Sequence, residues 1–181
     1  GSARPAMTPA SLGGPAAAPL SPAPRLVIAD AVAAVIELED GRYLLQRRDD
    51  IPEIWFPGHW GCFGGAMDSG EDPLAALRRE LAEEIEFKLG EATNFTRLDF
   101  DLGVLGLGRL SRIYYAVKMT QVERARLVLH EGAGMEAFAG DALGDLRLAP
   151  YDAFALFLYH QRRRLGRDPP REWVKTKNSG F

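Results

Sequence analysis

Three glutamates in a short charged segment could bind a cation together. Glu80, Glu83 and Glu84 are spaced by three and four residues, which brings side chains together on one face of a helix. At about 100° per residue they fall within a sector of roughly 100°. An apolar stripe at helical spacing lies beside this sector and consists of Leu74, Leu77, Leu81 and Ile85. The carboxylates are therefore expected to be half sheltered by the core.

Clustered carboxylates repel one another unless a cation lies between them. Like charges at these spacings cost about 0.2–0.5 kcal/mol per pair in water, and more where solvent is partly excluded. Carboxylate oxygens are hard ligands suited to Mg²⁺ or Mn²⁺, which would remove this cost. The charged string alone is equally typical of a solvated helix face.

The residues before the glutamates extend the pattern. Five residues separate Gly65 from Glu71, and seven more separate Glu71 from Arg79. The segment then continues as Glu80-Leu81-Ala82-Glu83-Glu84-Ile85-Glu86-Phe87. This spacing, with the strand and glycine pair of residues 60–65 before it, resembles the Nudix box, and a match at many positions is far more specific than a short motif. Only Glu86 departs from the box, because the family has a glycine there that ends the helix.

The resemblance implies a role for each matching residue. The implied metal ligands are the carbonyl oxygen of Gly65 and the carboxylates of Glu80, Glu83 and Glu84. Glu84 is the first choice for a direct ligand, and Glu80 is either a ligand or the base that activates water. Glu71 and Arg79 are expected to pair and to hold the loop against the helix. The implied reaction is attack of water on a phosphorus of a diphosphate, with Mg²⁺ or Mn²⁺ as cofactor.

Two residues outside the box are further candidates. Arg48 lies where Nudix proteins often carry an arginine that contacts substrate, and a guanidinium suits phosphate or a base edge. A surface ion pair with Asp49 or Asp50 is the alternative. Glu131 precedes Gly132 after an apolar stretch, where Nudix enzymes often place a catalytic glutamate on a loop facing the metal helix. An ordinary solvated turn glutamate is the alternative for Glu131.

The resemblance leaves a choice between functions. The preferred one is metal-dependent hydrolysis of the diphosphate linkage of a nucleoside diphosphate derivative. The signatures of the ADP-ribose, NADH and coenzyme A hydrolases are absent, which leaves a nucleoside triphosphate, deoxynucleoside triphosphate or nucleotide sugar. The alternative is a catalytically silent Nudix-fold nucleotide-binding or regulatory module, for which Glu86 is the only hint. An isopentenyl diphosphate isomerase is set aside, since Cys62 lacks that enzyme's motif.

Several regular elements must position these residues. Asp72 and Pro73 are typical of the start of a helix, and Pro150 is expected to open a second amphipathic helix. The packing residues expected on that second helix are Tyr151, Phe154, Phe157 and Leu158. Strands are predicted over Leu26–Leu38, from Tyr43, and over Trp60–Phe63, Thr93–Phe100 and Leu107–Met119. The predicted fold is a Nudix-type α/β/α sandwich with a mixed sheet.

The loop of residues 49–59, between two of these strands, contains aromatic residues that could contact a base. Its two prolines and Gly58 break any regular element and are typical of a functional loop. Trp55, Phe56 and the adjacent Trp60 could stack on a nucleobase, but packing within the protein is favoured because aromatic residues bury readily.

Composition limits the partners and the compartment. The net charge of −3 and pI of about 5.7 provide no broad positive field, so a small nucleotide is expected as the partner and a long nucleic acid is not. No run of about 18 apolar residues is present, so no membrane association is expected. The single cysteine, Cys62, excludes an internal disulfide and fits a reducing, cytoplasmic location. A homodimer is left open.

The two ends of the sequence differ in composition from its centre. Residues 1–24 contain six of the 12 prolines and seven alanines, a composition that cannot bury a core and predicts a disordered arm. A single Nudix domain is expected over residues 25–167, because the chain has the apolar content for one core. Residues 168–181 are expected to form a polar tail.

Overall fold

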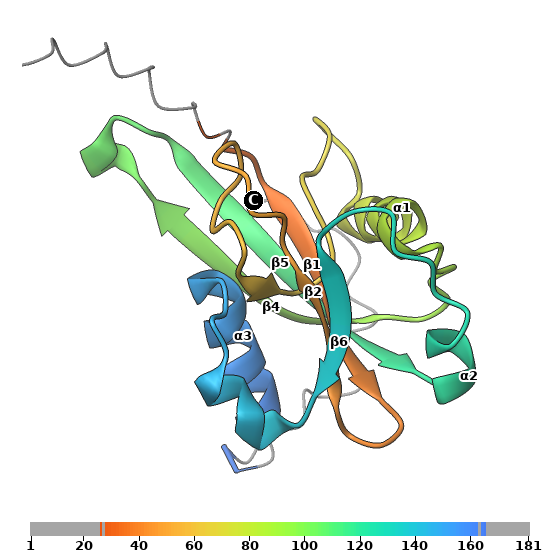
Figure 1. Cartoon of the computed structure of the whole chain (residues 1–181). Coiled ribbons are helices and arrows are strands. Elements are labelled where there is room, and N and C mark those ends of the chain that lie inside the picture. Colours follow the sequence, from red (N-terminus) through yellow and green to blue (C-terminus); the bar gives the residue numbers. More distant parts are fainter. Residues whose placement is uncertain (1–25, 27, 163, 166–181) are drawn as a thin grey trace, which may run out of the picture.

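A mixed six-stranded sheet lies at the centre of the computed structural model, which describes residues 26, 28–162 and 164–165 (Figure 1). Its strands are β1 (Ala31–Leu38), β2 (Tyr43–Arg47), β3 (Trp60–Gly61), β4 (Thr93–Asp101), β5 (Arg109–Met119) and β6 (Gly134–Phe138). The order is β3-β2-β1-β5-β4, and β6 also pairs with β2. β1 and β5 are parallel, with Ala31 opposite Arg112 and Leu38 opposite Met119. The other named pairs are antiparallel.

Helices cover both faces of this sheet, α1 (Pro73–Ile85) on one and α3 (Pro150–Gln161) on the other (Figure 1). Alternate residues of β1 point into two separate cores. Val32 and Ile36 pack in the core under α1, whereas Ala33 and Val35 pack in the core under α3. A strand buried on both faces reads as a continuous apolar run, as this one does. The predicted α/β/α sandwich is confirmed. The remaining elements are α2 (Gln121–Arg124) and the 3₁₀ turns η1 (Gly103–Leu105) and η2 (Gly140–Asp145).

The helix that carries the glutamates begins where the sequence predicted. The Asp72 side chain accepts hydrogen bonds from the backbone N–H groups of Leu74 and Ala75, both at 3.0 Å, and Pro73 occupies the first turn. At the other end Glu86 has φ 53° and ψ 30°, in the left-handed region. Glu86 therefore ends the helix in the conformation that glycine adopts readily, although this conformation costs free energy for a residue with a side chain.

The expected packing face of α3 was partly wrong. Phe154 and Phe157 are 52% and 56% exposed, and Tyr151 and Leu158 are only partly buried. The helix instead buries the face that consists of Asp152, Ala155, Leu156 and Tyr159. Asp152 faces inward because its carboxylate accepts hydrogen bonds from groups of the sheet, and this choice rotates the two phenylalanines outward.

Other boundaries differ less from the predictions. The first strand starts at Ala31 rather than Leu26 because Asp30 leaves the ladder, and its side chain accepts hydrogen bonds from the N–H and hydroxyl of Ser111. The strand predicted over Trp60–Phe63 has only its first two residues in β3. β6 was not predicted at all. The predicted arm (residues 1–24) and tail (residues 168–181) lie outside the described residues. Among the described helices, none is long and apolar enough to cross a membrane.

Candidate active site

The glycine pair after β3 lies between β1 and α1. Gly64 has φ +129°, and a Cβ there would collide with the backbone oxygen of Val32. A Cβ on Gly65 would collide with the carboxylate of Glu80. The Gly65 carbonyl accepts a hydrogen bond from the N–H of Val32 at 2.9 Å. Gly64 therefore needs glycine, because its backbone conformation and the nearby Val32 backbone exclude a side chain. A side chain at Gly65 would displace the carboxylate of Glu80.

Arg79 joins this loop to the helix. Its Nε and Nη2 donate to the two carboxylate oxygens of Glu71 at 3.1 and 2.9 Å, and Nη2 also donates to the carbonyl of Ala66 at 3.0 Å. Nη1 donates to Glu80 and lies 3.6 Å from Glu83. Hydrogen bonds with Glu71 and Glu80 raise the pKa of Arg79, and the hydrogen bond from Arg79 lowers the pKa of Glu71. The structure thus brings together the residues expected to orient the loop.

The three glutamates of the helix differ in their surroundings. Glu84 is 4% exposed, and its carboxylate accepts hydrogen bonds from the N–H of Gly64 at 2.9 Å and from Gln46 Nε2 at 3.3 Å. Burial, with added repulsion from Glu131 and Glu80, raises the pKa of Glu84 to about 8. Burial also raises the pKa of Glu80, although Arg79 opposes the shift. The Glu83 side chain is 65% exposed. The expectation of half-sheltered carboxylates therefore describes Glu80, while Glu84 is buried and Glu83 is not.

Glu131 lies on a loop that is tied to this region by backbone contacts. The N–H of His130 donates to the carbonyl of Glu84 at 2.8 Å, and the N–H of Ala133 donates to the carbonyl of Arg47 at 2.8 Å. Gln46 Nε2 donates to the carbonyl of Glu131 at 3.1 Å as well as to Glu84. These bonds hold the loop that carries Glu131 against the C-terminal end of α1.

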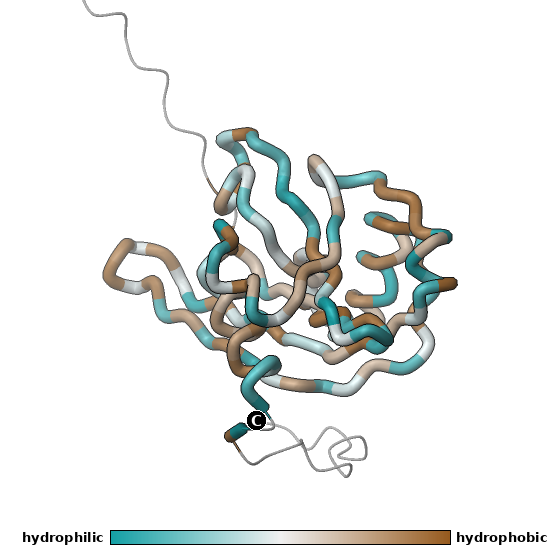
Figure 2. Tube along the Cα trace, turned by 60° about the horizontal axis from the view of Figure 1, so that its bottom comes forward, coloured by the Kyte–Doolittle hydropathy of each residue, from teal (hydrophilic) through white to brown (hydrophobic). Residues whose placement is uncertain are grey.

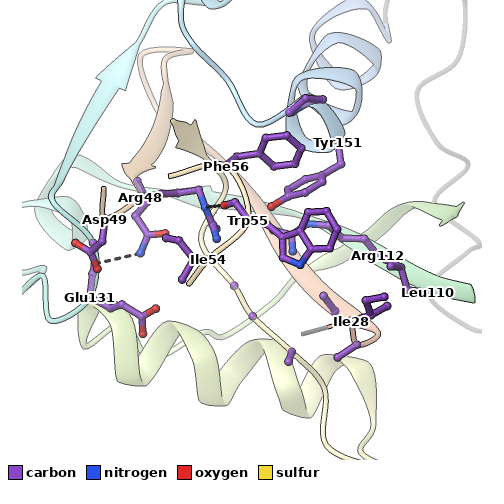
Figure 3. Close-up of a pocket in the computed structure, with 18 of the residues that line it drawn as sticks. Ile28, Arg48, Asp49, Ile54, Trp55, Phe56, Leu110, Arg112, Glu131 and Tyr151 are labelled. Carbon is purple, nitrogen blue, oxygen red and sulfur yellow. Dashed lines mark hydrogen bonds between the residues drawn. The ribbon is translucent and has the colours of Figure 1, made fainter. Parts of the chain in front are cut away.

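A cavity of about 540 Å³ connects these groups to an apolar region. Gly65, Glu84 and Glu131 line one end. Side chains from the sheet, the loop of residues 49–59 and α3 line the other, and Figure 3 shows Ile28, Leu110, Arg112, Trp55 and Tyr151 on the side away from Glu131. The volume is typical of a small-molecule site, which combines an apolar wall with a few polar groups.

The loop of residues 49–59 provides two aromatic side chains of the cavity wall and the carbonyl that accepts a hydrogen bond from Arg48. Arg48 lines the cavity and donates from Nε to the carbonyl of Trp55 at 2.8 Å (Figure 3). Among the described residues it forms no ion pair with Asp49 or Asp50. Trp55 and Phe56 line the cavity, whereas Trp60 packs edge-on against Phe138 at 4.8 Å. Phe56 also packs edge-on against His59 and Tyr151, at 5.6 and 5.4 Å between ring centres, and Trp55 lies 6.2 Å from Phe56. The favoured expectation of packing therefore describes all three residues, although Trp55 and Phe56 line the cavity as well.

Sequence reasoning missed three polar residues of the cavity region. Gln46 supports both Glu84 and the Glu131 loop. Arg112 and Asp152 form a buried pair, with Nε to Oδ1 at 3.2 Å. The signal that could have found Arg112 is a charge directly before the apolar and aromatic run from Ile113 to Val117. A buried charge needs a partner, but that partner comes from 40 residues away.

The donor set fits a divalent cation that is shared with a substrate. In the part of the chain that the structure describes, no three acidic, histidine or cysteine side chains already form a complete ligand set. Mg²⁺ commonly takes one or two carboxylates and fills its other positions with waters and substrate phosphates. The raised pKa values of Glu84 and Glu80 show carboxylates crowded by burial and by one another. A cation between them would relieve this repulsion.

Known proteins resemble the chain in sequence. The family profile described as NUDIX domain matches residues 27–138. The nucleoside triphosphatase NudI of Escherichia coli O139:H28 is 44% identical over 62 residues, which are 33% of this chain and 43% of that protein. NudI of Salmonella paratyphi B is 38% identical over 78 residues, 41% of this chain and 55% of that protein. The matched regions thus span about half the length of these relatives.

Solved structures resemble the chain in fold. The Escherichia coli ORF135 protein superimposes with a TM-score of 0.61 at 21% identity, covering 82% of this chain and 96% of that one. The MutT Nudix hydrolase of Burkholderia pseudomallei gives a TM-score of 0.56 at 28% identity, covering 74% and 96%. The Nudix domain of Shewanella oneidensis NrtR, solved with ADP ribose, gives 0.56 at 19%, covering 76% and 89%. Since the family profile covers more than half of its residues, the chain belongs to the Nudix family and is MutT-like.

Proposed function

We propose that this protein hydrolyses the diphosphate linkage of a nucleoside triphosphate or a related nucleotide, with Mg²⁺ or Mn²⁺ as cofactor. One observation carries the proposal: Glu84, Glu131 and Gly65 line one end of a cavity whose other end is apolar and aromatic. A nucleotide has the same division, with its phosphates at one end and its base at the other. The NudI relatives, which are named nucleoside triphosphatases, support this substrate class.

The metal ligands would be the carbonyl oxygen of Gly65 and the carboxylates of Glu80, Glu83 and Glu84. When bound there, the cation would neutralise charge on the phosphate oxygens and lower the pKa of a bound water. The hydrogen bonds of Arg79 with Glu71 and with the carbonyl of Ala66 hold the glycine loop against the helix that carries these glutamates.

Glu131 is the proposed base, and Glu80 is its alternative. The carboxylate of Glu80 is already engaged with Arg79, whereas Glu131 is exposed at the cavity edge. Glu131 would accept a proton from water as the water oxygen bonds to phosphorus. The bridging P–O bond then breaks, and the leaving phosphate departs with the electron pair. Arg48 also lines the cavity, and its guanidinium would contact the substrate.

The test is a panel of nucleoside triphosphates, deoxynucleoside triphosphates and nucleotide sugars, incubated with Mg²⁺, with Mn²⁺ or with EDTA and analysed for every phosphorus-containing product. We expect release of pyrophosphate or phosphate from a nucleoside triphosphate, or of a sugar phosphate from a nucleotide sugar, with metal and no release with EDTA. A panel on which nucleotides bind but no product forms would contradict the proposal and favour a Nudix-fold binding or regulatory module.

A further inference from the structure

A buried ion pair lies beneath the apolar end of the cavity. Arg112 of β5 is 8% exposed, and Asp152 in the first turn of α3 is fully buried. Asp152 accepts hydrogen bonds from Arg112 Nε at 3.2 Å, from the Tyr114 hydroxyl at 2.9 Å and from the N–H of Cys62 at 2.9 Å. Both carboxylate oxygens are therefore used, and the charge of Arg112 is balanced within the protein.

One end of the Arg112 guanidinium has no such partner. Nη2 is buried and makes no hydrogen bond among the described residues. Buried donors in folded proteins are nearly always paired, because an unpaired one destabilises the fold. The group is nevertheless held in place, since the guanidinium carbon lies 4.7 Å from the ring centre of Tyr151 and 5.7 Å from that of Tyr114.

The surroundings of Arg112 indicate what kind of group would accept from Nη2. Arg112 lines the same cavity as Glu84, and its neighbours on that wall are apolar or aromatic, among them Ile28, Leu110 and Trp55 (Figure 3). A flat, largely apolar group with a hydrogen-bond acceptor fits this wall. Because Asp152 already balances the positive charge, a neutral acceptor suits the position better than a second anion.

We propose that Arg112 determines base specificity: when a nucleotide enters the cavity, the side chains that cover Nη2 move aside, and Nη2 donates to the exocyclic carbonyl oxygen at position 6 of a purine or position 4 of a pyrimidine. This inference rests on the proposed function, since it assumes that the cavity holds a nucleotide with its phosphates at the glutamates. A base that presents an amino group at the same position would place a donor against a donor and leave Nη2 unpaired. Sites built to form such a bond discriminate strongly against analogues that lack it.

The test compares two pairs of nucleotides, ITP with ATP and UTP with CTP. Within each pair the bases differ in whether one exocyclic position carries a carbonyl oxygen or an amino group. We expect kcat/KM to be at least about tenfold higher for the carbonyl member of at least one pair, which corresponds to about 1.4 kcal/mol. In Arg112→Lys, which keeps a positive charge beside Asp152 but lacks Nη2, that preference should fall to within about threefold.

Arg109→Lys on the same strand is the matched control, because the Arg109 side chain is 84% exposed and lies outside the cavity wall. It should keep the wild-type preference. Dissociation constants for the same four nucleotides, measured by calorimetry, separate this inference from the proposed function. A carbonyl preference in binding without turnover supports the inference and contradicts the proposed function. Turnover with equal dissociation constants within both pairs supports the proposed function and contradicts the inference about Arg112.

Two further outcomes would overturn the role of Arg112. One is a preference for the amino members in the wild-type protein, and the other is an unchanged carbonyl preference in Arg112→Lys. Should Arg112→Lys fail to fold, the wild-type constants still decide, because equal binding of both members of each pair excludes the proposed hydrogen bond. Failure of all four nucleotides to bind would contradict the role of Arg112, whereas the proposed function is decided by the wider panel described above.

Discussion

The two ends of the cavity are built in different ways. The acidic end is largely local: Gly64, Glu71, Arg79 and Glu84 lie within about twenty residues of one another in the sequence and meet through contacts between one loop and one helix. The apolar end brings together segments that are far apart, such as Ile28, Trp55, Leu110 and Tyr151, together with the pair Arg112 and Asp152.

This difference assigns the reaction to the acidic end and the choice of substrate to the apolar end. A local constellation with fixed spacing can keep one reaction geometry, because a helix and its glycine loop define it. An assembled wall can change one residue at a time without disturbing that geometry. We therefore expect substitutions at the acidic end to change turnover on every substrate, and substitutions at the apolar end to change the choice among substrates.

The largest effect is expected at the acidic end from Glu84→Gln. Loss of a metal-binding carboxylate should reduce kcat about a thousandfold or more on every substrate, since metal ions supply several kcal/mol of transition-state stabilisation. Steady-state kinetics at saturating Mg²⁺ or Mn²⁺ would measure this. Glu91→Gln, an identical change at an exposed position outside the cavity, is the control and should be near wild type. Near-normal turnover in Glu84→Gln would remove Glu84 from the ligand set.

A smaller loss of turnover is expected from Glu131→Gln. Loss of a general base typically reduces rates by about 10²–10⁴-fold, and we expect about a hundredfold fall in kcat. Thermal stability should be nearly unchanged, because the loop is held by the backbone of its neighbours and by the carbonyl of Glu131 rather than by its carboxylate. Activity within a few fold of wild type would leave Glu80 as the remaining candidate base.

The metal-free protein should show the strain of the acidic end as a dependence of stability on pH. The pKa of Glu84 is about 8 in the folded protein against an ordinary value of 4.5. Its contribution to the free energy of unfolding is therefore full below about pH 4.5 and is lost as the pH rises through 8. Between pH 5 and 8.5, the free energy of unfolding of wild type should fall by a few kcal/mol relative to that of Glu84→Gln. Urea unfolding in EDTA at both pH values measures this difference, and a constant difference would show that Glu84 is not buried as described.

The smallest effect is expected from Glu86→Gly, at the junction between the helix and the Glu131 loop. Glycine relieves the left-handed conformation, worth about 1–2 kcal/mol, but has greater freedom in the unfolded chain. It also removes the exposed contact of Glu86 with His130 Nε2 at 2.6 Å, worth about 1 kcal/mol at most. The net change in unfolding free energy should stay within about 1 kcal/mol, with turnover unchanged. A tenfold fall in turnover would show that this contact positions the Glu131 loop.

The same difference between local and assembled structure explains what the sequence could predict. The start of α1, its buried stripe and the Arg79 to Glu71 contact depend on spacings of at most eight residues, so the pattern was sufficient. The nearly continuous apolar run over Leu26–Leu38 likewise predicted a strand, although the strand begins only at Ala31 because Asp30 bonds to Ser111 instead.

The apolar end could not be predicted in this way. An amphipathic interpretation of α3 turns apolar residues inward, yet Asp152 is buried and Phe154 is exposed. The burial of Asp152 depends on its ion pair with Arg112. Arg112 lies in β5, so it leaves no periodic signal in the sequence of the helix. β6 was missed for a related reason, because its stability comes from its pairing with β2 rather than from its own short sequence.

The central claim is that Glu84 binds the catalytic cation, and proton release on Mn²⁺ binding tests it most directly. At pH 7 a carboxyl group with a pKa of about 8 carries its proton in most metal-free molecules, and a metal ligand must lose it. Calorimetric titration with Mn²⁺ in two buffers of different ionisation enthalpy counts the protons released. We predict close to one proton per bound Mn²⁺ in wild type and nearly none in Glu84→Gln, with weaker binding. Equal proton release and equal affinity in the two proteins would contradict the account.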